Sequence, residues 1–220
     1  MMDFLFPEIP EWKETKKILT SNILGNISQF KVEWKFLSYD LKNRINSWKT
    51  DKTQGGGALS HFCSHTFHYM EFFLGKIQSI DSAFSYSKKS VNHAETRVTM
   101  NVLFESGYYG QIDLDIAFSG TPIHKLEFFS NRGNIVLQNL TTNIVDGFEL
   151  FLSTNDEKKP ILPTNHFINV DPTEDPRIKA ILPIAKRFIH WCENGISSKP
   201  DFEDGLRVQE LIELTRNSHS

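Results

Sequence analysis

The sequence predicts an α+β fold, in which a mostly antiparallel, open β-sheet carries helices on one of its faces. Three observations predict it. Six strand-like segments follow one another between residues 77 and 153, short turns rather than helices separate them, and helical patterns stand before and after that region. Consecutive strands joined by tight turns form hairpins, whereas parallel strands need long crossover connections. Residues 1–220 are therefore expected to form a single domain.

The first part of the chain predicts two strands, one helix and a loop. Residues 3–7 are predicted to be a short apolar strand, and residues 10–21 a helix that begins at a proline and ends before Gly25. Residues 27–37 alternate apolar and polar side chains, as half-buried strands do. Residues 38–54 are polar and lack a clear period, so a loop is expected there.

A run of three glycines precedes a long helical pattern. Apolar side chains recur at helical spacing over residues 58–74, and Gly75 is expected to end the helix. The run from Gly55 to Gly57 matches the dinucleotide-binding fingerprint only loosely, with Asp81 at a plausible distance for a ribose hydroxyl. That fingerprint needs a buried strand before the glycines and alternating strands and helices after them, and this sequence has neither. No cofactor-binding residue is therefore predicted in this chain.

The second part of the chain supplies most of the sheet. The predicted strands are residues 77–86, 96–104, 110–118, 124–130, 134–138 and 147–153. Residues 175–194 form an amphipathic helical pattern, and residues 202–217 a second one that opens with acidic side chains. Asp204 and Arg207 are expected to cap and charge-balance this last helix. Helices thus bracket the sheet.

Composition and charge exclude several classes of protein. An apolar share of 39% and 18 Phe provide material for a folded core. A net charge of −3, with Lys and Arg spread along the chain, gives no footprint for nucleic acid or an anionic membrane. Only Cys63 and Cys192 occur, and neither a secretory leader nor a long apolar stretch is recognised, so a cytoplasmic location is predicted.

Three histidines share one face of the helix predicted after the glycines. His61, His65 and His68 are spaced at i, i+4 and i+7. Three interpretations fit this pattern. In the first, the imidazoles make ordinary hydrogen bonds at the helix–sheet boundary. In the second they hold zinc, but no metal site is predicted because no fourth ligand stands in a recognisable pattern. They can also contact a substrate, where one of them takes a hydroxyl proton as hydride leaves the carbon.

Two segments resemble the C-terminal domain of the glucose-fructose oxidoreductase, inositol dehydrogenase and rhizopine-catabolism (Gfo/Idh/MocA) family. The first, from Trp48 to Gly75, holds a Trp-Lys pair, the triple glycine and the histidines. The second, residues 199–209, holds a Pro, an Asp-Gly pair and a Gln before the last helix. Residues 3–25 resemble the first strand and helix of that domain. The resemblance implies a dihydrodipicolinate reductase-like fold.

The resemblance also implies a function and a set of site residues. The chain would be the substrate-binding and oligomerisation domain of an NAD- or NADP-dependent oxidoreductase that acts on a hydroxyl of a sugar, sugar derivative or cyclitol. The Rossmann domain that binds the cofactor lies outside this chain. The family's catalytic His matches His65, while His61 stands where the family has an Asp. These two are the predicted catalytic residues, and the predicted substrate contacts are Lys49, Trp48 and His68.

The substitution of the family's Asp leaves two functions open. The intact protein can be an oxidoreductase in which His61 orients His65 or deputises for it. Alternatively, it is a non-catalytic sugar-binding or regulatory relative with the same fold. His61 and His68 favour this alternative because both replace acidic residues of the family. Family members pair through the open face of the sheet, so the resemblance also implies a homodimer or tetramer.

Overall fold

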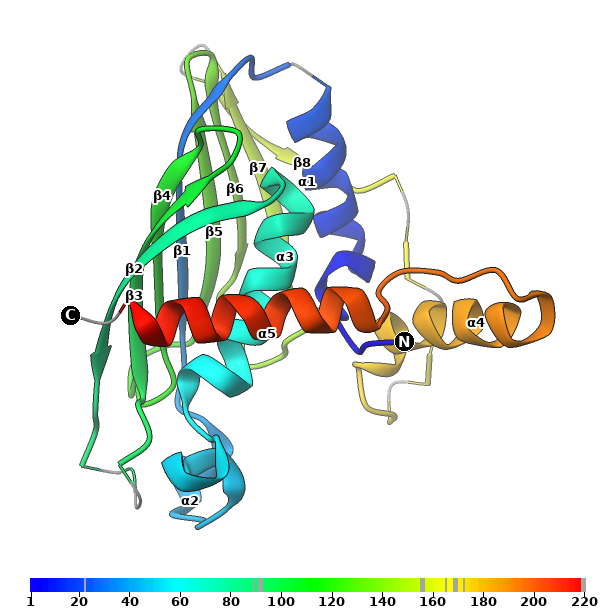
Figure 1. Ribbon diagram of the computed structural model, residues 1–220. Helices are drawn as coiled ribbons and strands as arrows, with labels where there is room; N and C mark the ends of the chain where they lie inside the picture. Colours follow the sequence, from blue (N-terminus) through cyan, green and yellow to red (C-terminus); the bar gives the residue numbers. More distant parts are fainter. Residues whose placement is uncertain are drawn as a thin grey trace.

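The computed structural model describes residues 1–21, 23–88, 90, 93–154, 157–164, 166–167, 170–171 and 173–218. One open sheet runs through the molecule, and helices cover one of its faces (Figure 1). The α+β class and the mostly antiparallel sheet are therefore confirmed. None of the helices in these ranges is long and apolar enough to cross a membrane.

The sheet contains eight strands in the part of the chain that is described. They are β1 (Ile27–Lys35), β2 (Ile77–Ser85), β3 (Arg97–Phe104), β4 (Tyr109–Asp115), β5 (Ile123–Ser130), β6 (Gly133–Asn139), β7 (Glu149–Thr154) and β8 (Glu157–Ile161). Their order is β2-β3-β4-β1-β5-β6-β7-β8. All neighbours are antiparallel except β1 and β4. The first strand of the chain thus lies in the middle of the sheet, between two strands that are consecutive in sequence.

Five α-helices and four short helical turns accompany the strands in the described ranges. The helices are α1 (Pro10–Thr20), α2 (Tyr39–Asn43), α3 (Ser64–Leu74), α4 (Ile178–Asn194) and α5 (Phe202–Asn217). The turns are the 3-10 turns η1 (Phe6–Glu8), η2 (Trp48–Thr50) and η3 (Lys52–Gln54), and the π-helical turn η4 (Leu59–Cys63). Figure 1 shows α1 and α3 against the sheet, α5 crossing α3, and α4 projecting away.

Two of the segments expected before the glycine run differ from the structure. The strand predicted at residues 3–7 is wrong, because Pro7 lies within the 3-10 turn η1 and the apolar side chains Phe4 and Phe6 pack under α3 instead of joining the sheet. The loop predicted at residues 38–54 contains the short helix α2 and the 3-10 turns η2 and η3, and the side chains of Ser47 and Asp51 cap these two turns.

The core lies between the sheet and the helices that cover it. Alternate residues of β3 are buried, so that one face of this strand is apolar. Trp12 of α1 is fully buried, and its ring lies 4.8 Å from the ring of Tyr69 and 5.5 Å from that of Phe73, both on α3. These contacts fix α3, and with it the histidines that it carries, against the sheet.

The last helix is held by its charges. Nη2 of Arg207 lies 2.9 Å from Oε1 of Glu71 on α3 and also donates to the carbonyl oxygen of Ile77 at 2.8 Å. Oδ2 of Asp204 accepts a hydrogen bond from the backbone N–H of Asp201 at 2.7 Å, as part of a capping box. The structural roles predicted for Asp204 and Arg207 are thus confirmed.

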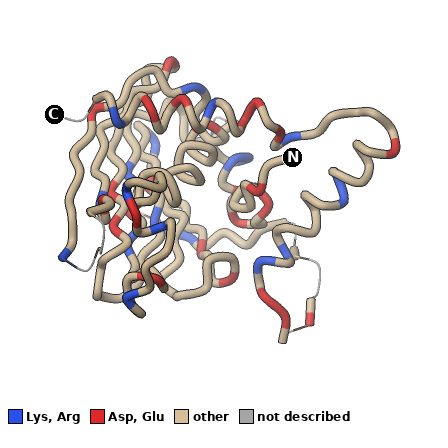
Figure 2. The backbone as a smooth tube through the Cα atoms, turned by 60° about the horizontal axis from the view of Figure 1, so that its bottom comes forward, with Lys and Arg blue, Asp and Glu red and all other residues tan. Residues whose placement is uncertain are grey.

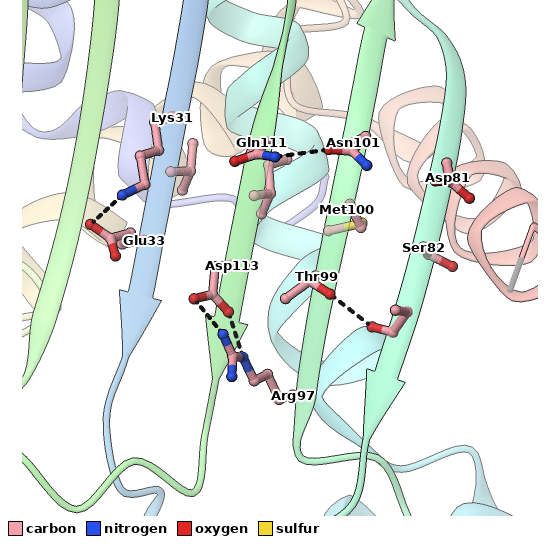
Figure 3. A pocket seen from close by; sticks show the side chains of 13 residues that line it. Lys31, Glu33, Asp81, Ser82, Arg97, Thr99, Met100, Asn101, Gln111 and Asp113 are labelled. Carbon is pink, nitrogen blue, oxygen red and sulfur yellow. Dashed lines mark hydrogen bonds and ion pairs between the residues drawn. The ribbon is translucent and has the colours of Figure 1, made fainter. Parts of the chain in front are cut away.

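The uncovered face of the sheet is polar. Arg97 forks onto Asp113 with bonds of 2.7 and 3.0 Å, and Nε2 of Gln111 donates to Oδ1 of Asn101 at 3.1 Å (Figure 3). These pairs line a shallow hollow of about 380 Å³ on that face. Figure 2 shows basic and acidic residues interspersed along the chain rather than gathered in regions of one sign.

Candidate active site

A cavity of about 610 Å³ lies beside the N-terminal end of the helix formed by η4 and α3. Its wall combines the N-terminal segment, the end of β1, the start of β5, the loop after β6 and the start of α4. Aromatic side chains such as Phe6, Trp34 and Phe62 supply the apolar part of this wall. Cavities of this size and character hold small molecules such as a monosaccharide.

His65 lies in the first turn of α3 and faces this cavity. The rings of Phe4 and Phe6 contact it edge-on, at centroid distances of 6.0 and 5.7 Å. Its Nδ1 is buried and has no hydrogen-bond partner among the described residues. Burial lowers the pKa of His65 to about 4. The imidazole is therefore neutral at pH 7, a state in which one of its nitrogens can accept a proton.

His61 lies one turn earlier, in the π-helical turn, and also lines the cavity. The ring of Trp48 meets it edge-on at 5.4 Å. Burial, together with the positive charge of Lys49, lowers the pKa of His61 to about 4, and the carboxylate of Asp40 opposes the shift. π-Helical turns are rare in proteins, and many of those that occur lie at functional sites. The continuous helix predicted for residues 58–74 therefore has an irregular start at the position that carries His61.

The five predicted site residues separate into two groups. His61, His65 and Lys49 line the cavity. Trp48 and His68 are not among the lining residues: Trp48 is half exposed and packs against His61, while His68 stacks on Phe4 at 4.1 Å. Burial lowers the pKa of His68 to about 4.

A fourth histidine that sequence reasoning missed also lines the cavity. His124, at the start of β5, stacks on Trp34 with centroids 4.5 Å apart, and its Nε2 lies 3.3 Å from the hydroxyl oxygen of Tyr69. Burial, and to a smaller extent the proximity of His65, lowers the pKa of His124 to about 3. One signal in the sequence could have found it. His124 occupies an inward position of the β5 alternation, which is otherwise apolar at Leu126 and Phe128.

The backbone amides at and after the end of the glycine run are bonded within the protein and position the histidine helix. The N–H of Gly57 donates to the carbonyl oxygen of Lys49 at 2.9 Å, and that of Leu59 donates to Oε1 of Glu95 at 3.0 Å. The N–H of Ala58 donates to the carbonyl oxygen of Glu95 at 2.9 Å. Because these amides are already bonded within the protein, they do not fit a dinucleotide phosphate. Among the residues that the structure describes, no group of three or more His, Cys, Asp or Glu side chains is arranged to hold a metal ion.

Replacing Gly57 by Ala is expected to destabilise the domain by at least about 3 kcal/mol. A Cβ at this position would lie 2.2 Å from Oε1 of Glu95, and φ is +122°. Gly55→Ala is the matched control, because its φ is +80° and nothing lies within 4 Å of the added atom. It should cost only about 1–2 kcal/mol. Urea unfolding of both variants measures the difference, and equal losses would contradict the proposed contact.

Comparisons with known proteins bear on the family and the fold. A family model described as "Oxidoreductase family, C-terminal alpha/beta domain" matches residues 16–220. An uncharacterized oxidoreductase of Synechocystis sp. is 25% identical over 232 aligned positions, which cover 99% of this chain and 62% of the relative. Levoglucosan dehydrogenase in complex with NADH and levoglucosan superposes with a TM-score of 0.80 and 18% identity, covering 99% of this chain and 63% of that one.

A second solved structure gives a similar result. Aldose-aldose oxidoreductase from Caulobacter crescentus, complexed with glycerol, superposes with a TM-score of 0.79 and 14% identity over 99% of this chain and 61% of that one. The chain thus spans less than two thirds of the length of these relatives.

Proposed function

Because the chain belongs to the Gfo/Idh/MocA oxidoreductase family, as its C-terminal α/β domain, we propose that it binds the substrate of an NAD- or NADP-dependent oxidoreductase. The substrate is a sugar, sugar derivative or cyclitol that reacts at a hydroxyl. The observation that carries this proposal is the placement of the neutral imidazole of His65 in the wall of a cavity of monosaccharide size. The ligands of the two solved relatives, levoglucosan and glycerol, are polyols and support the same substrate class.

In the proposed reaction His65 moves the hydroxyl proton. When bound, the nicotinamide supplies hydride transfer, and residues outside this chain hold its dinucleotide. A neutral nitrogen of His65 accepts the proton of the reacting hydroxyl, and the aromatic wall excludes water from it. His61 stands where the family has an Asp, and we propose that it orients the substrate or passes the proton onward. Lys49 donates a hydrogen bond to a substrate oxygen, while Trp48 and His68 act by holding His61 and the N-terminal segment in place.

One observation favours the alternative function. In the described structure no carboxylate contacts His65, so nothing stabilises its protonated form, as would suit a sugar-binding relative without activity. The intact protein should be assayed with NAD and NADP against neutral sugars, sugar acids and cyclitols. We expect reduced nicotinamide to form with at least one of them. Thermal stabilisation by a sugar without any nicotinamide turnover would instead establish a binding protein.

We also propose a homodimer or tetramer that assembles through the open face of the sheet, in the cytoplasm, where Cys63 and Cys192 stay reduced. The Arg97–Asp113 pair lies on this face and suits a polar, hydrogen-bonded interface. Light scattering should give at least twice the mass of one protein chain, and Arg97→Glu should lower it by placing like charges side by side. A monomer at micromolar concentration would contradict the assembly.

A further inference from the structure

We propose that the substrate carries an anionic group, a carboxylate or a phosphate, and that Lys42 and Lys49 bind it. The inference rests on the proposed function, because it names the substrate class of the same cavity. Lys42 lies on α2 and Lys49 on η2, in the polar segment between β1 and the glycine run. Both side chains line the cavity that His65 faces.

The charges in the wall of the cavity are unbalanced. The charged residues that line it are Lys35, Lys42, Lys49, Arg177 and Asp3. Nζ of Lys35 lies 2.8 Å from Asp113 and 3.0 Å from Glu33, so its charge is compensated. Arg177 forks onto Asp175, with Nε donating to Oδ1 at 2.9 Å. Two of the four cations are therefore already paired with carboxylates.

The other two cations have no such partner in the described ranges. Neither Lys42 nor Lys49 makes an ion pair there. The remaining lining carboxylate is Asp3, which faces Arg177. Burial raises the pKa of Asp3, and the charge of Arg177 opposes this rise. The carboxylate of Asp40 also acts on His61, but it does not line the cavity and makes no ion pair with either lysine in the described ranges. Two uncompensated ammonium groups thus make this end of the cavity positive, which attracts anionic ligands.

The positions of the two lysines suit a substrate with two different ends. Lys49 is half buried and lies close enough for its charge to lower the pKa of His61, whereas Lys42 is exposed at the rim. A carboxylate or phosphate has several acceptor oxygens, each of which can accept a hydrogen bond from an ammonium group. A sugar acid or sugar phosphate can therefore place its anionic end between the lysines while a neutral hydroxyl faces His65.

Binding measurements on the intact protein test this inference without requiring turnover. Calorimetric titrations should use glucose, glucuronate, glucose 6-phosphate, NAD and NADP with wild type, Lys42→Gln, Lys49→Gln and the double variant. Lys76→Gln is the matched control, since Lys76 is exposed beyond the other end of α3. We expect at least one anionic sugar to bind about tenfold tighter than glucose, and each cavity variant to weaken it by about five- to tenfold. The loss should be clearly larger for the anionic sugars than for glucose, and added salt should weaken only the anionic sugars.

Other outcomes overturn the inference. It fails if neither anionic sugar binds, if glucose binds as tightly as both, or if the lysine variants weaken the dinucleotides instead of the sugars. Turnover separates this failure from failure of the proposed function. A protein that oxidises a neutral sugar and shows no preference for anionic ones retains its proposed function and loses this inference. A protein that binds sugar acids through the lysines without any nicotinamide turnover keeps this inference and loses the proposed oxidoreductase function.

Discussion

Lowering the pH from 7 to 4 is expected to reduce the free energy of unfolding by about 6 kcal/mol through two buried histidines. The pKa of His65 is lowered from 6.5 to about 4 and that of His124 to about 3, both by burial. Between these values and 6.5 the unfolded chain binds protons that the folded domain does not. The stabilising effect is therefore complete above about pH 6.5 and is lost as the pH falls toward the folded-state pKa values.

The size of this loss makes it easy to measure. Each histidine contributes about 3 kcal/mol, and typical domains have a net stability of only 5–15 kcal/mol. Urea unfolding at pH 7 and pH 4 should show a loss of at least this size, and His124→Gln should reduce the loss by about 3 kcal/mol. His190→Gln is the control, because His190 is exposed. Equal stability at the two pH values, or an unchanged pH dependence in His124→Gln, would contradict the burial of these neutral imidazoles.

Replacing His65 by Ala is expected to lower the turnover of the intact enzyme by about 10²- to 10⁴-fold, the usual contribution of a general base. The base must be neutral to accept the hydroxyl proton, so kcat/KM for oxidation should fall only as the pH drops through about 4, the pKa of His65. Initial rates across the pH range at which the protein stays folded measure both effects. His190→Ala should change neither. An acid limb near pH 6.5, or an undiminished rate in His65→Ala, would exclude this role.

The sequence predicted most of the sheet because its strands alternate apolar and polar residues over short distances. β3 shows this best, since every second residue is buried. Strand β8 was missed, because its sequence Glu-Lys-Lys-Pro-Ile is polar and contains a proline, which edge strands tolerate. The central place of β1 was missed as well. It depends on pairing with β4 and β5, which are far away in sequence, and local patterns do not encode such partners.

The candidate site was predicted only in part. Helical spacing and family resemblance pointed to His61 and His65, and both line the cavity. His124 comes from a distant strand, and its proximity to His65 arises only when β5 packs under α3. The irregular π-helical start at Leu59–Cys63 could not be foreseen either, since the apolar period of this segment fits a regular helix. The charge balance of the cavity likewise depends on which lysines find carboxylates in the folded chain.

The most direct test is to measure sugar binding and nicotinamide reduction on the same preparations of wild-type and His65→Ala intact protein. If His65 moves the proton and does not hold the substrate, the variant should bind its sugar within about threefold of wild type while reduction falls by at least about 100-fold. Reduction that persists in the variant, or sugar binding that is lost together with reduction, would contradict the role proposed for this domain.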